Sequence, residues 1–337
     1  MSTHESDPAA AGPAMAPAIP SAAAWTIGLV GYGEVGRILA EDLRAQGAAV
    51  RAYDLKLHGP KRAELQDHAA RHGVQLVESH ADLASDCGLV ISAVTASQAV
   101  AVAVACAPAL PRAAFFLDLN SASPGAKTRA FEAVEAAGGR YVEGAVMTSV
   151  PPYRIRVPLL LGGPYAPVLE PLLNALDFAA KVHSAQLGVA SATKMCRSVM
   201  IKGLEATVIE SFTTARHYGV EDAVIASLHE TFPGIDWEKQ AAYFFQRVIE
   251  HGRRRAEEVR EVAQTVREAG LEPFSAAGTD ERQAWVADLA DAGLFGERGS
   301  RGFARSPDWR TEADRLLARQ DDVTRPTPLT DDPDTRS

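Results

Sequence analysis

Short apolar runs alternate with amphipathic segments along the chain from Trp25 to about residue 185. Apolar runs of about four to eight residues are typical of strands buried on both faces, and apolar positions three or four residues apart are typical of helices that cover them. The alternation predicts successive β-α-β units around a parallel sheet, which is an α/β fold of the doubly wound, Rossmann-type class.

The predicted strands occupy residues 25–30, 48–53, 74–77, 88–94, 115–120, 140–145, 157–163 and 179–183. Helices are predicted between them, including one that begins at Pro124, because proline suits the first turn of a helix. Pro158 lacks the amide proton that a strand ladder needs, so its strand is predicted to lie at an edge or to be irregular.

The strand pattern stops near residue 185, and segments with helical spacing replace it up to about Gln320. This change predicts an all-helical C-terminal domain. Both ends of the chain are rich in small and polar residues and in proline, which predicts disorder. The predicted organisation is a disordered tail (1–23), an α/β domain (24–185), an all-helical domain (186–320) and a second disordered tail (321–337).

The first predicted strand ends in a glycine-rich turn, Gly31-Tyr-Gly33-Glu-Val-Gly36. At this spacing the first glycine permits a tight turn, the second lets the backbone approach a pyrophosphate, and the third allows close packing of helix on strand. Asp54 ends the second strand about 20 residues later, where a carboxylate accepts hydrogen bonds from the adenosine ribose. The turn therefore predicts dinucleotide binding, with a purely structural turn as the alternative.

Polar loops follow the fourth and fifth predicted strands. Ligands of an open parallel sheet lie beyond the carboxyl ends of its strands, so residues 94–97 and 118–123 are predicted to face the cofactor. The alternative is that these Ser, Thr and Asn side chains only satisfy the backbone of their turns. The predicted cofactor contacts are Gly31, Tyr32, Gly33, Glu34, Val35, Gly36, Asp54, Val94, Thr95 and Asn120.

NAD is predicted in preference to NADP, because the charge of Asp54 would repel a 2′-phosphate. Arg51, Lys56, Lys61 and Arg62 are close in sequence and could pair with that phosphate, so NADP stays open.

Composition argues against several other classes of function. The 337 residues carry a net charge of −9, which argues against broad affinity for nucleic acid, and no apolar run reaches the ~20 residues that a membrane span needs. Cys87, Cys106 and Cys196 are odd in number and lack CxxC spacing, so neither a disulfide framework nor a zinc site is indicated, and no metal ligands are predicted. A reducing, cytoplasmic location fits this pattern.

A second stretch that could carry catalytic residues begins the helical half at Gly188. Lys194 lies near the predicted helix start, where burial and the positive end of the helix disfavour its charged form and suit it to proton transfer. Ser198 lies one turn later on the same face, whereas Lys202 is rotated about 80° away. Ser198 is thus the helix residue that could partner Lys194, and the alternative is a solvated surface lysine.

The glycine turn and the lysine stretch, in this order, resemble the β-hydroxyacid dehydrogenase family, which includes 3-hydroxyisobutyrate and 6-phosphogluconate dehydrogenases. The family's cofactor signature resembles Ile27 to Gly36, and its Asp-x-Ser-Thr-x-x-Pro loop resembles Asp118 to Pro124. Residues 144–149 fall where the family carries a Ser-Gly-Gly substrate loop. The helical half resembles most closely the subgroup with a phosphogluconate-dehydrogenase-like C-terminal domain.

The resemblance implies a catalytic role for Lys194 and substrate contacts from Ser121, Thr148, Ser149 and Ser198. Three departures qualify it. Ser198 replaces the usual Asn, Thr148-Ser149-Val150 replaces Ser-Gly-Gly, and Ile201 stands where the phosphogluconate enzymes carry a second acid. An alkyl group cannot protonate an enediol, so oxidation is expected without decarboxylation.

A basic cluster, Arg253 to Arg255, follows an aromatic run that contains Trp237 and Tyr243 to Phe245. The arginines could bind a substrate anion, across a dimer interface if two helical domains pack together. Surface pairs with Glu257 and Glu258, one turn later, are the alternative. The spacing of the aromatic residues predicts more apolar surface than one neighbouring helix covers, and hence a homodimer.

The sequence therefore predicts an NAD(P)-dependent oxidoreductase that moves hydride between the nicotinamide and a small, anionic β-hydroxy acid or the corresponding semialdehyde or keto acid, with Lys194 as general acid/base. Imine reduction on the same architecture is an alternative, although a lysine at the proton-donor position argues against it. A dinucleotide-sensing protein without turnover is the alternative outside enzymes.

Overall fold

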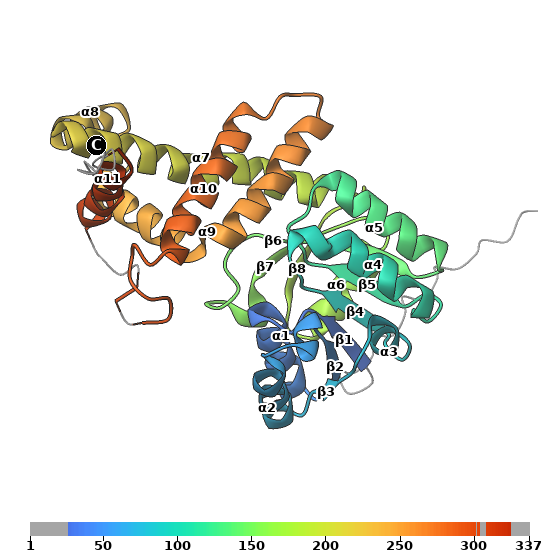
Figure 1. Cartoon of the computed structure of the whole chain (residues 1–337). Coiled ribbons are helices and arrows are strands. Elements are labelled where there is room, and N and C mark those ends of the chain that lie inside the picture. The colour runs from blue at the N-terminus through green and yellow to red at the C-terminus, as the bar shows by residue number, and fades with distance from the viewer. Residues whose placement is uncertain (1–25, 301, 304–307, 325–337) are drawn as a thin grey trace, which may run out of the picture.

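The computed structural model describes residues 26–300, 302–303 and 308–324 (Figure 1). The predicted tail 1–23 and most of the second tail lie outside these ranges. The last described helix, α11 (Trp309–Thr324), continues past residue 320, at which we expected the helical half to end. Among the described residues, no helix is long and apolar enough to cross a membrane.

A mostly parallel, eight-stranded sheet forms the N-terminal half and confirms the predicted α/β class. The strands are β1 (Thr26–Val30), β2 (Ala49–Tyr53), β3 (Gln75–Leu76), β4 (Leu89–Ser92), β5 (Phe115–Asp118), β6 (Arg140–Val146), β7 (Pro158–Gly162) and β8 (Ala179–Ser184). They lie in the order β3-β2-β1-β4-β5-β6-β7-β8. The chain winds outward from β1 to β3 on one side and from β4 to β6 on the other, so the crevice in which such sheets bind ligands lies between β1 and β4.

Strand β7 differs from our expectation. It pairs with β6 in antiparallel and with β8 in parallel orientation, so it is an interior strand, and the edge position that we considered for Pro158 is wrong. Pro158 is tolerated because it is the first residue of the strand. The strand is irregular at its other end, where the register shifts between Leu161 and Gly162.

Helices cover both faces of the sheet (Figure 1). They are α1 (Glu34–Ala45), α2 (Arg62–His72), α3 (His80–Ala84), α4 (Ala99–Cys106), α5 (Pro124–Ala136) and α6 (Ala166–Ala175), with short 3-10 turns η2 (Leu55–His58), η3 (Ala96–Gln98), η4 (Ala107–Ala109) and η5 (Arg154–Arg156). Helices α3, α4 and α5 lie together on one face. Every residue of β4 and β5 is buried, which explains why both strands are apolar up to their last residues, Ser92 and Asp118.

The C-terminal half is helical, as predicted. It consists of α7 (Val189–Tyr218), α8 (Glu221–Thr231), α9 (Trp237–Glu268), α10 (Phe274–Asp291) and α11. Figure 1 shows α7 running from the sheet to the far end of the molecule, where α8 and α11 pack, while α9 and α10 form an antiparallel pair across it.

Most of the aromatic residues of α9 lie inside this helical half. Trp237, Phe244 and Phe245 are at most 7 % exposed and pack in one core with Phe212 and Trp309. For these three side chains the expectation of uncovered apolar surface is wrong, because helices of the same chain cover them from several sides. Tyr243 differs, since it is 49 % exposed.

Candidate active site

Three glycines shape the loop between β1 and α1. Gly31 has a φ of 91°, and a Cβ there would meet the carbonyl oxygen of Ala93 at 2.4 Å. A Cβ on Gly36 would lie 1.9 Å from the carbonyl oxygen of Gly31, so glycine is required for α1 to pack this closely. A Cβ on Gly33 would meet no described atom within 4 Å. The loop therefore leaves space beside Gly33, where the sequence predicted the approach of a pyrophosphate.

The amino end of α1 opens onto this space. Its N-cap residue is Gly33, and no side chain of the described residues caps the helix. The first amides of a helix have no partner within the helix and carry partial positive charge, so this end suits an anion. Glu34 is exposed and Val35 is half-buried. Tyr32 is fully buried, and its hydroxyl bonds to Nδ1 of His68 at 2.8 Å, so its side chain faces the interior and not the crevice.

Asp54 lies beside the turn, as predicted. One carboxylate oxygen accepts a hydrogen bond from the Tyr32 N–H at 2.8 Å, and the other accepts one from the Lys56 N–H at 2.9 Å. The first bond ties the end of β2 to the glycine turn. Each oxygen keeps further acceptor capacity for a ribose hydroxyl.

Asn120 joins the loops that follow β4 and β5. Its Oδ1 accepts a hydrogen bond from the Val94 N–H at 2.7 Å, and its Nδ2 donates to Ser92 Oγ at 2.9 Å. The side chain is 3 % exposed, and both of its polar atoms are engaged. Asn120 thus holds the loop in place, and its direct contact with a cofactor stays a prediction. Thr95 is exposed and bonds to Ser97.

Lys194 reaches from the second turn of α7 toward the sheet. Its Nζ donates a hydrogen bond to Ser121 Oγ at 2.6 Å, in the loop after β5. Burial lowers the pKa of Lys194 to about 8, although the charge of Glu258 opposes this shift. Lys194 is therefore no solvated surface lysine, and the partner that the structure gives it is Ser121 and not the predicted Ser198.

The other predicted substrate contacts lie on two elements. Ser198 is on α7, one turn beyond Lys194, and is 8 % exposed. Thr148 and Ser149 are exposed in the loop that leaves β6. Because β6 runs parallel to β5, this loop and Ser121 emerge from the same edge of the sheet. The structure thus gathers the predicted residues at the carboxyl edge, next to the start of α7.

Helix α9 adds charged residues that we did not predict as part of the site. Glu258 Oε2 accepts a hydrogen bond from Lys202 Nζ at 2.6 Å, and Oε1 pairs with Arg254. Burial opposes the ionisation of Glu258, but the charges of Lys202 and Arg254 lower its pKa to about 2. Its negative charge acts on Lys194. No helical spacing connects residues 194 and 258, so this proximity was not predictable from the pattern of residues.

The Arg253–Arg255 cluster splits into separate contacts. Arg253 pairs with two aspartates of α10, and Arg255 is buried against Glu205. Arg254 pairs with Glu258, as the surface-pair interpretation predicted, but its side chain is 58 % exposed and its charge acts on Lys194. Arg254 therefore lies near Lys194 of the same chain.

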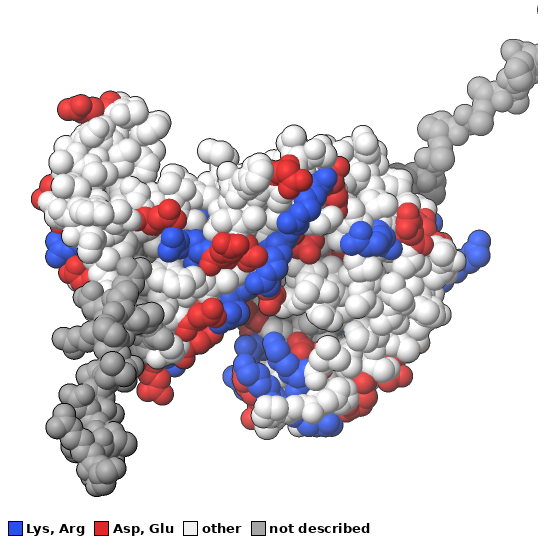
Figure 2. Space-filling model, turned by 45° about the horizontal axis from the view of Figure 1, so that its top comes forward, with Lys and Arg blue, Asp and Glu red and all other residues white. Residues whose placement is uncertain are grey.

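Helix α9 also extends along the crevice toward the glycine turn. The charges of Glu250 and Glu34 oppose the lowering of the His251 pKa that burial causes, which places His251 near the start of α1. Figure 2 shows a hollow between the helical half and the sheet half, with Lys and Arg side chains on both of its sides. The crevice is therefore suited to anions although the whole chain is acidic.

Glu143 fixes the amino end of α7. It is fully buried in β6, and its Oε1 accepts hydrogen bonds from the N–H groups of Gly188 at 2.8 Å and Ala190 at 3.1 Å. A Cβ on Gly162 would lie 2.2 Å from the same oxygen, so glycine at this position of the neighbouring strand leaves room for the Glu143 carboxylate. We did not predict this residue, although a single acid within an apolar strand was visible in the sequence.

A second contact joins the two halves at α5. Ser123 donates from its N–H to Glu261 at 2.8 Å and from its hydroxyl to Glu268 at 2.9 Å, and the Gly125 N–H donates to Glu268 at 2.9 Å. Carboxylates of α9 thus accept hydrogen bonds from the amino end of α5 and hold the helical half against the Ser121 loop.

Two family descriptions match the chain. Residues 26–165 match the NAD binding domain of 6-phosphogluconate dehydrogenase, and residues 215–286 match a domain of unknown function, DUF1932.

Solved structures agree with this assignment. A conserved hypothetical protein from Sinorhizobium meliloti 1021 is 36 % identical, over 88 % of this chain and 96 % of that one, with a TM-score of 0.69. A conserved protein of unknown function, described as structurally similar to 3-hydroxyacid dehydrogenases, is 29 % identical over 79 % of this chain and 98 % of that one, with a TM-score of 0.62.

The 3-hydroxyisobutyrate dehydrogenase of Mycobacterium tuberculosis shares the fold at 18 % identity, over 79 % of this chain and 95 % of that one, with a TM-score of 0.64. This chain therefore belongs to the β-hydroxyacid dehydrogenase family, in the subgroup that joins a 6-phosphogluconate-dehydrogenase-type NAD-binding domain to a DUF1932 domain.

Proposed function

We propose that this protein is an NAD(P)-dependent oxidoreductase that interconverts a small β-hydroxy acid and the corresponding semialdehyde or keto acid. The observation that carries the proposal is Lys194, a half-buried lysine with a pKa lowered to about 8 that is hydrogen-bonded across the crevice to Ser121. A pKa near the working pH makes both protonation states available, as a general acid/base requires.

The residues of the turn fit a dinucleotide. The uncapped amino end of α1 and the open position beside Gly33 would hold its phosphates, and Asp54 would accept hydrogen bonds from a ribose. The backbone at Val94, which Asn120 holds in place, would border it. When bound, NAD(P) supplies the hydride acceptor for oxidation and the hydride donor for reduction.

We assign the proton transfer to Lys194. During oxidation the substrate carbon gives up a hydride, the hydroxyl oxygen gives up a proton, and a C=O bond forms. Neutral Lys194 accepts that proton at Nζ, and in the reverse reaction the ammonium group returns it to the oxygen. Ser121 Oγ, 2.6 Å from Nζ, keeps the amine directed at the crevice.

The charges of the crevice favour a small anionic substrate. Arg254 is exposed and near Lys194, and a guanidinium group binds a carboxylate through two parallel hydrogen bonds. Ser198, Thr148 and Ser149 would provide further polar contacts. Glu258 neutralises part of this positive charge, which keeps the site selective for ligands that carry few negative charges.

The proposal includes a homodimer formed through the helical halves. It is supported by large apolar side chains that the chain itself leaves exposed there: Met200 at 71 % and Ile201 at 41 % on α7, and Phe274 at 82 % on α10.

The experiment that tests the function is a panel of hydroxy acids, semialdehydes and keto acids assayed with both cofactors, followed by the absorbance of the reduced nicotinamide. Turnover of a hydroxy acid that depends on Lys194 supports the proposal. Tight cofactor binding without turnover of any panel member would favour a dinucleotide-sensing protein.

A further inference from the structure

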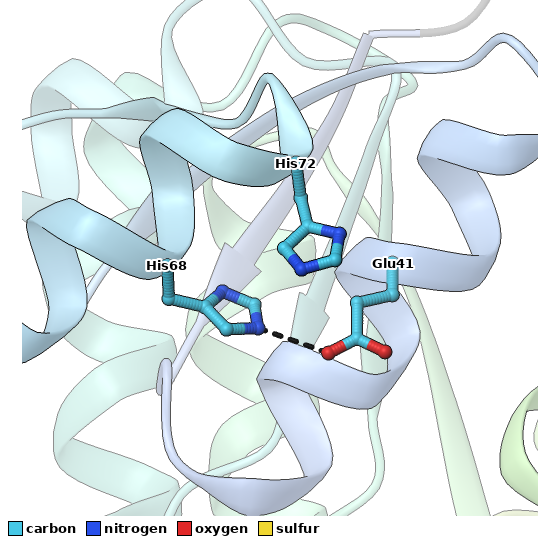
Figure 3. Close-up of side chains that lie close together, drawn as sticks. All are labelled: Glu41, His68 and His72. Atoms are coloured by element: carbon cyan, nitrogen blue, oxygen red, sulfur yellow. Dashed lines mark hydrogen bonds and ion pairs between the residues drawn. The ribbon is translucent and has the colours of Figure 1, made fainter.

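Glu41, His68 and His72 form a cluster outside the catalytic crevice, where α1 packs against α2 (Figure 3). The two histidines lie one turn apart on α2, and Glu41 faces them from α1. We propose that these three side chains are a binding site for a divalent cation of the zinc class, which would clamp α1 to α2.

The donor set suits zinc. Imidazole nitrogens and a carboxylate oxygen are ordinary zinc ligands, and three protein ligands leave the fourth tetrahedral position for water. The ligand atoms all lie within 4.8 Å of one another. With metal–ligand bonds of about 2.0–2.1 Å, donor atoms in a tetrahedral site are about 3.3 Å apart, so small side-chain rotations close the site. The i, i+4 spacing puts both imidazoles on one face of α2.

Neighbouring groups orient His68. The side chain is buried, its Nδ1 bonds to the Tyr32 hydroxyl at 2.8 Å, and its Nε2 bonds to Glu41 Oε1 at 2.9 Å. In metal sites, a partner on the second ring nitrogen fixes the tautomer and aims the first nitrogen at the ion. Tyr32 is in the position to do this. When Nδ1 carries the proton, it donates to the Tyr32 oxygen, and the lone pair of Nε2 is left for the cation.

Arg154 holds the other side of Glu41. Its NH2 contacts Glu41 Oε2 at 2.7 Å, which leaves Oε1 for the histidines. Asp42 also bonds to this guanidinium group, at 2.9 and 3.2 Å, and balances its charge.

His72 is the third proposed ligand. It is half-buried, its ring stacks on His68 with centroids 4.6 Å apart, and its ring nitrogens have no hydrogen-bond partner in the part of the chain that the structure describes. A shared cation would give the two stacked imidazoles a common partner. Because Tyr32 also bonds to Asp54 through its N–H, the clamp would extend to the glycine turn.

The test is a calorimetric titration of the full-length chain, without an affinity tag, with Zn²⁺. We expect one zinc per chain, a melting temperature that rises with zinc concentration, and a tetrahedral absorption spectrum when Co²⁺ replaces zinc. His72→Ala should weaken zinc binding by at least about tenfold while leaving the metal-free melting temperature almost unchanged, because the His72 side chain has no hydrogen-bond partner among the described residues. Glu41→Gln should weaken it similarly.

Two control variants remove other exposed zinc-binding side chains. Cys196→Ser and His217→Ala lie outside the cluster and should leave the stoichiometry and affinity unchanged. Failure of the wild-type chain to bind zinc at up to millimolar concentration would overturn the proposal, and so would binding that His72→Ala leaves intact. These measurements need neither substrate nor dinucleotide, so their outcome is independent of the proposed oxidoreductase activity.

Discussion

Lys194 is a single residue whose chemistry depends on the fold around it. A solvated lysine is almost fully protonated at neutral pH, whereas burial lowers the pKa of Lys194 to about 8. For oxidation, kcat/KM should rise with pH and level off above about 8, because the lysine accepts a proton only when neutral. For reduction it should fall above about 8, because the lysine must then be protonated. Profiles without an inflection between about pH 7 and 9 would contradict this assignment.

Glu258 provides a second test at the same scale. Glu258→Gln removes the charge that favours the protonated form of Lys194, so the inflection should move to lower pH. It also leaves the buried Lys202 without its ion-pair partner, which should cost about 3–5 kcal/mol of stability. Chemical denaturation and pH profiles measure the two effects separately. Glu257→Gln, which changes a neighbouring acid, is the control, and an equal shift in both variants would rule out a specific role for Glu258.

The choice of cofactor depends on Asp54. We expect a higher kcat/KM with NAD than with NADP, because Asp54 disfavours a 2′-phosphate. The structure strengthens this expectation, since Arg51 pairs with Asp86 at 2.8 Å and Arg62 pairs with Glu78 at 3.0 Å. Lys56 and Lys61 have no ion pair among the described residues. A clear preference for NADP would show that these lysines outweigh Asp54.

At the scale of elements, α7 carries the proposed catalytic residues and Glu143 determines where it starts. Glu143→Ala removes a charged acceptor of two hydrogen bonds, so it should lower the free energy of unfolding by about 1.5–3 kcal/mol and should lower kcat through displacement of Lys194. Glu143→Gln keeps an acceptor oxygen and should have the smaller effect. Denaturation and steady-state kinetics decide this, and full stability and activity of Glu143→Ala would show that α7 needs no such anchor.

The elements themselves were predictable where local pattern determines them. The runs that became β4 and β5 are apolar except at their last residues because both faces are buried, and the glycine turn needs residues that tolerate its backbone. The direction of β7 was not predictable, because pairing depends on the path of the chain and not on periodicity. The partners of Lys194 were not predictable for the same reason, because Ser121 and Glu258 are far from it in sequence.

At the scale of the whole molecule, the site draws on both halves of one chain. Light scattering should show a dimer, and activity per chain should nevertheless stay constant on dilution, since Lys194, Ser121 and Arg254 come from the same chain. Arg254→Ala should raise KM for an anionic substrate more than it lowers kcat, with no change in oligomeric state. Activity that falls as the dimer dissociates would contradict a site complete in one chain.

The aromatic residues of α9 show why a dimer interface is hard to predict from sequence. Their spacing is that of an exposed apolar face, yet α7, α10 and α11 cover Trp237, Phe244 and Phe245 within the chain. Helical periodicity tells which residues share a face, but it does not tell which element covers that face.

The central claim is that Lys194 transfers the proton in an oxidoreductase reaction. The most direct test compares turnover by wild type and Lys194→Ala on a hydroxy acid found in the panel, with cofactor affinity measured on both proteins. We predict a fall in kcat on the order of 10²–10⁴ with an almost unchanged Kd for the cofactor, because the lysine acts on the substrate and not on the dinucleotide. Turnover near the wild-type rate in Lys194→Ala would contradict the account.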